Sequence, residues 1–213
     1  MASDLVDLIP ARGGHFLLES GHHGELWLDL ELLCRRPEGV MALAKELAGR
    51  LAPLEPAVVC GPLAEGAFVA LLVATELGMD FMYTERLEHS QQDEDALRSE
   101  LPNEEPMMSR VRYRLPAPLR DLAKGKRVVV VNDVINAGSA LGGTLEQLDN
   151  YELETIAIGS LLTLGSGAEE LAGQYEVELV TLASLHNPIW LPTECPLCAD
   201  GLPLENPGEF PSG

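Results

Sequence analysis

Four consecutive valines, an acidic residue and a loop of small residues lie between residues 128 and 140, and this segment constrains the fold more than any other. The β-branched residues 128–131 are typical of a strand that is buried on both faces, as in a parallel sheet. Asp133 follows at the carboxyl end of this strand, the edge at which open α/β sheets bind ligands. The segment therefore predicts a buried strand with a ligand site at its mouth.

The turn after Asp133 has the composition of an anion-binding loop. Residues 136–140 can expose successive backbone N–H groups, and a helix expected through Leu141, Leu145 and Leu148 adds partial positive charge at its amino end. A phosphate fits such a loop, and Asp133 could accept hydrogen bonds from the hydroxyls of an attached ribose. The alternative interpretation is an ordinary strand-to-helix turn with a solvated aspartate.

The chain is strongly acidic, with 14 Lys+Arg against 34 Asp+Glu and a net charge of −20. This balance argues against nucleic acid or an anionic membrane as partner, because basic contacts dominate both kinds of binding. It also means that a phosphorylated ligand has to approach a repelling surface. Binding would then depend on local N–H groups, a few arginines and a divalent cation carried by the ligand.

Length and composition favour one cytoplasmic domain with appendages. A chain of 213 residues can bury one good core, and it contains no apolar span of 18 residues. The amino-terminal residues carry neither a basic stretch nor an apolar signal core. The four cysteines form no evenly spaced framework, which fits a reducing compartment.

Apolar periodicity predicts alternating strands and helices, which is typical of a mostly parallel, doubly wound sheet. The expected helices are 38–51, 67–77, a segment through 141–148, and 168–174; the expected strands are 57–60, 80–84, 128–131, 155–164 and 177–184.

Three further segments break this alternation. Residues 85–108 are acidic and proline-interrupted, and we interpret them as a long surface loop that is either a functional lid or a disordered insertion. Arg110, Arg112 and Arg114 alternate with apolar residues as one face of a strand, either as an anion-facing row or, as we favour, as a solvated face that offsets neighbouring acids. The proline-rich residues 186–213 are expected to wrap the surface irregularly.

Several segments resemble the type I phosphoribosyltransferases, and within them most closely the orotate phosphoribosyltransferases. Residues 128–140 resemble the family's phosphoribosyl-pyrophosphate (PRPP) motif, and residues 61–66 resemble its pyrophosphate loop, followed by a matching strand end at 83–86. Residues 14–29 resemble the hood segment that covers the base. Residues 195–204 look like the tail of some bacterial members.

The resemblance implies a mostly parallel sheet flanked by helices, with a small N-terminal hood (residues 1–37) on a single domain (1–185) and an irregular tail (186–213). It implies transfer of phosphoribose between PRPP, held with magnesium, and a pyrimidine-like base, in a homodimer. Asp133 would bind the ribose hydroxyls, Arg86 would lie near the pyrophosphate, and both would serve catalysis. Phe16 and Trp27 would surround the base. The PRPP-binding residues that it implies are Asn132, Asp133, Asn136, Ala137, Gly138, Ser139 and Ala140, together with Gly61, Pro62, Leu63, Ala64, Glu65 and Gly66.

The sequence departs from the family pattern where the family uses charge or hydroxyl groups. Asn132 stands at the first acidic position, and Ala137 and Ala140 replace hydroxyl residues of the turn. Glu19 and Leu87 occupy positions that are often basic. The family's mobile loop supplies a lysine and a His-Gly pair, but here no lysine lies between Lys45 and Lys124, and His89 is that loop's only histidine.

Two function classes therefore stay open. The first is an active phosphoribosyltransferase, for which Asp133, the pyrophosphate loop and the hood argue. The second is a ligand-sensing or regulatory protein that has kept the fold and lost catalysis, for which the missing cation argues, because charge at the leaving pyrophosphate contributes strongly to rate. An unrelated nucleotide-binding protein is a weaker interpretation, since neither a Gly-x-Gly-x-x-Gly fingerprint nor a Walker lysine is present.

Two of the four cysteines are candidate metal ligands. Cys195 and Cys198 have the spacing of two zinc ligands, but one pair is half a site, which His186 or a second subunit would have to complete. We favour a reduced structural pair without zinc. Cys34 and Cys60 lie in apolar company and are expected in the core.

Overall fold

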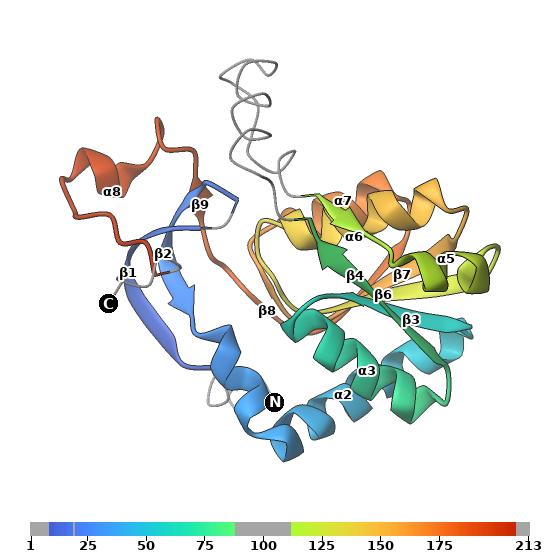
Figure 1. Cartoon of the computed structure of the whole chain (residues 1–213). Helices are drawn as coiled ribbons and strands as arrows, with labels where there is room; N and C mark the ends of the chain where they lie inside the picture. The colour runs from blue at the N-terminus through green and yellow to red at the C-terminus, as the bar shows by residue number, and fades with distance from the viewer. Residues whose placement is uncertain (1–8, 19, 88–111, 208–213) are drawn as a thin grey trace.

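The computed structural model describes residues 9–18, 20–87 and 112–207. Within these residues the chain forms two sheets (Figure 1): a six-stranded sheet in the order β5-β4-β3-β6-β7-β8 and a three-stranded sheet in the order β1-β2-β9. No helix among the described residues is long and apolar enough to cross a membrane.

The six-stranded sheet is parallel except at one edge. Its parallel strands are β3 (Val58–Pro62), β4 (Asp80–Arg86), β6 (Arg127–Ile135), β7 (Glu154–Leu164) and β8 (Glu178–Leu185). The two-residue strand β5 (Tyr113–Arg114) runs antiparallel to β4 at the edge. The predicted mostly parallel sheet is confirmed.

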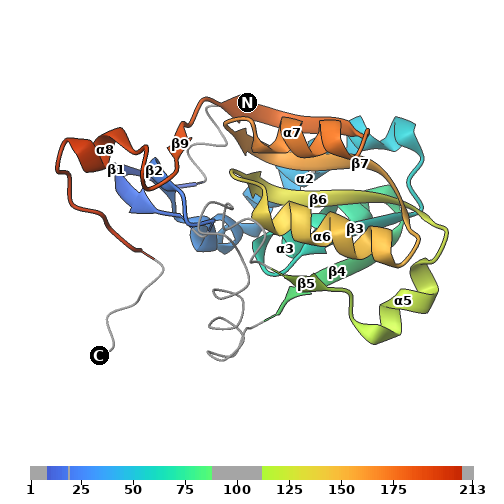
Figure 2. The same cartoon turned by 90° about the horizontal axis from the view of Figure 1, so that it is seen from above.

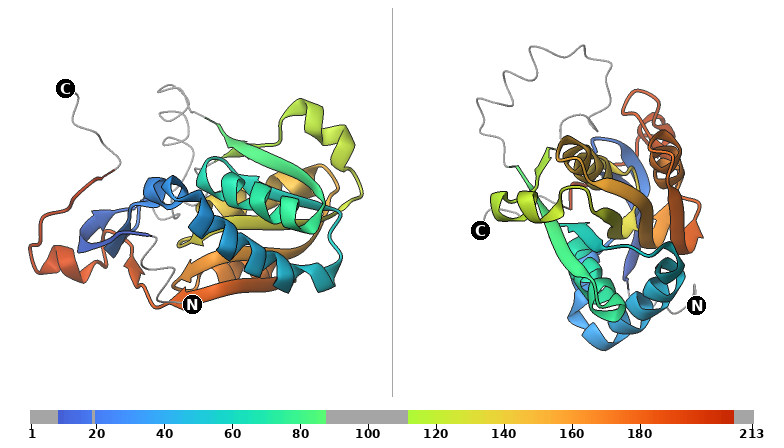
Figure 3. Two further views of the ribbon diagram at one scale, coloured as in Figure 1. Left: turned by 90° about the horizontal axis from the view of Figure 1, so that it is seen from below. Right: turned by 90° about the vertical axis from the view of Figure 1, so that its right-hand side faces the viewer.

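Helices cover both faces of this sheet, as Figures 2 and 3 show from opposite sides. The helices α2 (Pro37–Leu51) and α3 (Glu65–Leu77) lie on one face, and α6 (Ser139–Asn150) and α7 (Gly167–Gln174) lie on the other. A helix that periodicity did not predict, α5 (Ala117–Ala123), precedes β6. Two short 3-10 turns, η1 (Leu30–Arg35) and η2 (Ala52–Leu54), flank α2.

The run of valines explains the two-sided core. Val129 and Val131 belong to the cluster that contains residues of α2 and α3, whereas Val128 and Val130 belong to the cluster under α6 and α7. All four are fully buried, because successive side chains of a strand point to opposite faces and both faces are covered by helices. This is the burial that four adjacent β-branched residues predicted.

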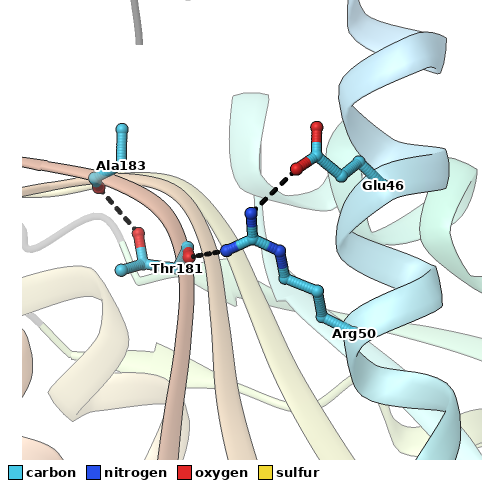
Figure 4. Close-up of polar contacts among 4 residues, drawn as sticks. All are labelled: Glu46, Arg50, Thr181 and Ala183. Carbon is cyan, nitrogen blue, oxygen red and sulfur yellow. Dashed lines mark hydrogen bonds and ion pairs between the residues drawn. The ribbon is translucent and has the colours of Figure 1, made fainter. Parts of the chain in front are cut away.

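Polar contacts also fix α2 to the far edge of the sheet (Figure 4). Arg50 Nη1 donates a hydrogen bond of 2.7 Å to the carbonyl oxygen of Thr181 in β8, and Arg50 Nη2 pairs with Glu46 at 2.8 Å. Thr181 Oγ1 in turn donates to the carbonyl oxygen of Ala183 at 2.8 Å. The orientation of α2 against β8 is therefore set by backbone as well as apolar contacts.

The three-stranded sheet joins the two ends of the described chain. Strands β1 (Ala11–Leu17) and β2 (His23–Leu28) form an antiparallel hairpin, and β9 (Ile189–Trp190) pairs with β2. The short helix α8 (Pro196–Ala199) follows β9. We call β1, β2 and β9 the hood sheet; Figure 1 shows it, with α8, beside the six-stranded sheet.

Some expectations about the irregular segments need correction. The stretch expected to wrap irregularly contains β9 and α8, whose pairing with residues near the amino terminus periodicity could not indicate. The expected loop at 85–108 begins later, because residues 85 and 86 continue β4. Residues 88–108, and with them His89, lie outside the described residues, as do Glu19 and Arg110.

Candidate active site

Asn132 and Asp133, the first pair of candidate residues, lie near the carboxyl end of β6 and differ in their access to the cavity. Asn132 lines a cavity at the carboxyl edge of the sheet, whereas Asp133 is not among the residues that line it. Asp133 is only 4% exposed, so the alternative of a solvated aspartate is wrong. Its backbone carbonyl accepts a hydrogen bond of 3.1 Å from Ser160 Oγ in β7.

The side-chain amide of Asn132 forms hydrogen bonds with the backbone of its own strand. Its Oδ1 accepts a hydrogen bond of 3.1 Å from the backbone N–H of Asp133, and its Nδ2 donates one of 3.1 Å to the carbonyl oxygen of Val134. A carboxylate at this position could not make the second bond, because it has no donor. The asparagine thus replaces an expected charge with a neutral group that is bonded within its own strand.

The loop from Asn136 to Ala140 has the geometry of an anion site. Gly138 adopts φ +83° and begins α6 without a side-chain cap, so the first-turn N–H groups of this helix have no side-chain acceptor. The buried Oδ1 of Asn136 has no hydrogen-bond partner. The loop and the first residues of α6 both line the same cavity, so the uncapped helix end lies at its wall.

The second loop, Gly61 to Gly66, packs against the end of β6. A Cβ atom at Gly61 would come within 2.7 Å of Ala70 Cβ, and one at Gly66 would overlap Asn132 Oδ1, so both positions need glycine. The loop contains a cis peptide between Leu63 and Ala64, and Leu63 N–H donates to the carbonyl oxygen of Thr84 at 2.9 Å. Among these loop residues only Glu65 reaches the cavity wall.

The cavity, of about 310 Å³, brings the hood sheet together with the loop after β6. Its residues from the loop side are Glu65, Asn132, Val134, Ile135, Asn136, Ala137, Gly138, Ser139, Ala140, Leu141 and Leu164; those from the hood side are Leu18, Ser20, Leu26, Trp27, Leu28 and Leu30. One wall is thus rich in backbone N–H groups and the other is apolar and aromatic. A ligand with a phosphate at one end and a flat base at the other matches both walls.

Two residues expected near a ligand do not line this cavity. Phe16 is 1% exposed and packs against Trp27, with ring centroids 6.1 Å apart, so Trp27 alone of the two reaches the wall. Arg86 ends β4, where its backbone pairs with Tyr113, and it is not among the lining residues. The expected basic row is likewise a surface feature at Arg114, which pairs with Glu85 at 2.9 Å, as we favoured.

Carboxylates lie both at the cavity wall and beside it. Burial raises the pKa of the half-buried Cys34 thiol, and the nearby carboxylates of Asp133 and Glu65 raise this pKa further. Among the described residues that line the cavity there is neither lysine nor arginine. A bound phosphate would therefore be held by backbone N–H groups and the helix end rather than by cationic side chains.

The cysteines fall into two groups. Cys60 is fully buried, which raises the pKa of its thiol to about 12, and Cys34 packs against the other apolar cluster, so both are core residues as expected. Cys195 and Cys198 meet His15 and His23 of the hood sheet. His186, which together with a second subunit was the alternative for completing a zinc site, lines a second cavity beside β8.

Sequence reasoning missed His15 and His23. In the sequence both belong to the hood segment, and His15 lies 180 residues from Cys195. No spacing rule identifies them as zinc ligands, because seven residues separate His15 from His23, whereas the usual zinc motif has three to five residues between two histidines.

Comparison with known proteins shows the family of the chain. The family model for the phosphoribosyl transferase domain matches residues 33–186, more than half of the chain, and the chain belongs to this family. The chain is 28% identical over 195 residues to an orotate phosphoribosyltransferase of Thermotoga maritima, with 92% of this chain and 90% of the relative covered. It is 27% identical over 209 residues to an orotate phosphoribosyltransferase of Desulforamulus reducens, with 96% and 95% covered.

Solved structures show the same fold. The orotate phosphoribosyltransferase of Aeropyrum pernix superimposes with a TM-score of 0.60 at 23% identity, covering 87% of this chain and 94% of that one. The adenine phosphoribosyltransferase of Giardia lamblia, complexed with 9-deazaadenine, gives a TM-score of 0.63 at 18% identity, covering 86% and 97%. The fold is therefore shared by enzymes named for a pyrimidine and for a purine.

Proposed function

We propose that this protein binds PRPP with magnesium and transfers phosphoribose to or from a pyrimidine-like base of the orotate type. The observation that supports this most directly is that the loop Asn136 to Ala140 and Trp27 line opposite sides of one cavity. The relatives named above, which align over nine-tenths of the chain, support the orotate type.

The phosphate end of the substrate would lie at the amino end of α6. Its uncapped first-turn N–H groups and the left-handed Gly138 provide donors whose direction does not depend on side-chain identity. The replacement of hydroxyl residues by Ala137 and Ala140 therefore removes side-chain bonds but leaves the backbone site. The base would lie between Trp27 and the apolar residues of the hood side.

Magnesium would arrive with the substrate's phosphates, and the wall offers oxygen atoms of the kind that this ion prefers. The Glu65 carboxylate belongs to a lining residue and is such a group, whereas Asn136 Oδ1 has no hydrogen-bond partner but is buried within the protein. The ion would offset negative charge on the ligand. The chain's own part is to hold the ribosyl phosphate and the base in one orientation, which contributes to rate by proximity.

The experiment is a calorimetric titration of the protein with PRPP, with and without magnesium. We expect magnesium-dependent binding that Ser139→Asp weakens at least about tenfold, because a carboxylate in the loop repels the phosphate. The same carboxylate stabilises the amino end of α6, so the variant should still fold. Ala117→Asp adds the same charge to the first turn of α5, away from the cavity, and should bind like the unchanged protein. Equal weakening by both variants, or no binding at all, would contradict the proposal.

A second candidate function is a PRPP- or nucleotide-sensing protein without turnover. The observation that favours it is Asn132, whose hydrogen bonds within its own strand replace the acidic residue of the family motif. A turnover assay with PRPP, magnesium and orotate separates the two candidates. We expect binding with slow turnover; a rate on the order of 10 per second would exclude the sensor, whereas binding without any turnover would favour it.

We also propose a homodimer, which rests on the resemblance to the family. Light scattering of the purified chain tests it directly. A monomer at micromolar concentration would contradict it.

A further inference from the structure

Four side chains from the two ends of the chain gather beside the hood sheet. His15 belongs to β1, and His23 begins β2. Cys195 directly precedes α8, and Cys198 lies within this helix, which Figure 1 shows beside the two strands. One nitrogen or sulfur atom from each lies within 4.8 Å of the others. We propose that these four residues hold a structural zinc ion that fastens the hood to the C-terminal segment.

The distances match the edges of a zinc tetrahedron. Zn–S bonds of about 2.3 Å and Zn–N bonds of about 2.0 Å place neighbouring ligand atoms about 3.3 to 3.8 Å apart. Here His15 Nε2 lies 3.5 Å from Cys195 Sγ and 3.7 Å from Cys198 Sγ. His23 Nδ1 lies 3.2 Å from Cys198 Sγ and 3.0 Å from His15 Nε2. The remaining two pairs, from Cys195 Sγ to Cys198 Sγ and to His23 Nδ1, lie within 4.8 Å, so small shifts of the side chains would place all four atoms around one ion.

A hydrogen bond behind His15 orients its ring for this role. Its Nδ1 lies 2.9 Å from the carbonyl oxygen of Leu202, which can only accept, so Nδ1 carries the proton and the lone pair of Nε2 faces the thiols. Histidines that bind zinc through one ring nitrogen usually donate a hydrogen bond from the other nitrogen to a carbonyl or carboxylate, which orients the ring. Two cysteines and two histidines make a closed, four-ligand set, which is structural rather than catalytic.

Burial makes a metal a better explanation than a reduced cluster. His15, His23 and Cys195 are at most 5% exposed, and their nitrogen and sulfur atoms converge on one another. Protons on the thiols and on one imidazole could join these atoms only in pairs through weak S–H bonds, whereas one cation binds all four atoms at once. Cys198 is exposed, which leaves a path for the ion to enter. The sequence favoured a reduced pair because two ligands were missing, and His15 and His23 remove that reason.

The ion would fix the position of the hood. The hood sheet has short strands, and β9 has two residues. The segment after α8 crosses it with two backbone bonds of 2.8 Å, from Leu17 N–H to Glu205 O and from Glu205 N–H to His15 O. None of the four proposed ligands lines the cavity, but Trp27 on the same sheet does. The zinc would thus set where this wall lies without touching the substrate.

The first test is the metal content of the untagged full chain after dialysis against metal-free buffer. We expect about one zinc ion per chain, released by a strong chelator together with a fall in melting temperature. This result does not depend on phosphoribosyl transfer, so its failure and the failure of the proposed function are distinguishable. Protein purified under reducing conditions without bound metal, or with a Cys195–Cys198 disulfide, would overturn the inference.

The second test compares ligand and control variants. Cys198→Ser and His23→Asn should retain less than about a tenth of the zinc. Cys34→Ser and His186→Asn remove the same residue types outside the cluster and should keep all of it. Equal zinc in the ligand and control variants would place the ion elsewhere and overturn the inference.

A spectroscopic readout reports on the hood alone. The chain has two tryptophans, Trp27 in β2 and Trp190 in β9, and both belong to the hood sheet. Removing zinc should therefore change tryptophan emission in the unchanged protein, and chelator should have no effect on Cys198→Ser. Emission that does not respond to zinc removal would contradict the fastening role.

Discussion

Gly138 is the residue at which the site depends most on backbone conformation. It adopts φ +83°, and a Cβ atom there would lie 2.6 Å from Leu171 Cδ1. We expect Gly138→Ala to lower the free energy of unfolding by about 1 to 3 kcal/mol, because a left-handed conformation is costly for any residue with a side chain. Chemical denaturation measures this change.

The matched control is Gly142→Ala, one turn further along α6. A Cβ atom at Gly142 would lie 3.7 Å from Leu171, which is an ordinary contact. In a helix interior alanine is more stable than glycine by about 0.5 to 1 kcal/mol. The two variants should therefore change stability in opposite directions. Two losses of similar size would show that contact with Leu171, and not the backbone angle, limits both positions.

At this scale the sequence predicted which segments form the site better than which side chains reach it. Asn132, Asp133 and the turn after them lie, as the sequence predicted, at the carboxyl end of a buried strand. It could not show that Asn132 faces the cavity and Asp133 does not, because that choice depends on the phase of one strand against its neighbours. The pairing of His15 and His23 with the cysteines also depends on long-range packing that no local pattern encodes.

Among the elements, α6 and β4 are joined by a buried hydroxyl pair. Thr84 Oγ1 and Thr144 Oγ1 lie 2.7 Å apart, and both residues are fully buried. We expect Thr144→Val to lower the free energy of unfolding by about 1 to 3 kcal/mol, because it leaves the buried hydroxyl of Thr84 without its hydrogen-bond partner.

A double-mutant cycle isolates this pair. Adding Thr84→Val to Thr144→Val also removes the hydroxyl that lacks a partner. The free energy of unfolding of the double variant should therefore fall by less than the sum of the two single decreases. Denaturation of all four proteins measures the coupling. Additive losses would mean that the two hydroxyls stabilise α6 and β4 independently.

The elements themselves were predictable in proportion to their length and burial. The helices α2 and α3 and the strands β6 and β7 agree with the expected segments to within a few residues, because their apolar periodicity or continuous apolar run is long. The two-residue strands β5 and β9 and the helix α8 carry too few residues to show a period. They form because neighbouring strands and side chains already lie beside them.

At the scale of the whole molecule, the charge of −20 opposes the proposed substrate. A cavity whose described lining residues include Glu65 but neither lysine nor arginine offers little long-range attraction to a phosphate. Its N–H groups act only at short range, since the field of a helix end falls off within about one turn. Approach and final binding should therefore respond differently to salt.

We expect the association rate of PRPP at fixed free magnesium to rise with ionic strength, the reverse of the usual behaviour of phosphate-binding proteins. Raising monovalent salt from about 0.01 M to about 0.15 M shortens the screening length from about 30 Å to about 8 Å, which weakens repulsion by the distant carboxylates more than the short contacts at Gly138 and Ser139. Stopped-flow measurement of tryptophan emission follows this rate, because Trp27, one of the two tryptophans of the chain, lines the cavity. An association rate that falls as salt is added would mean that positive charge from a part of the chain outside the described residues, or from a second subunit, attracts the substrate.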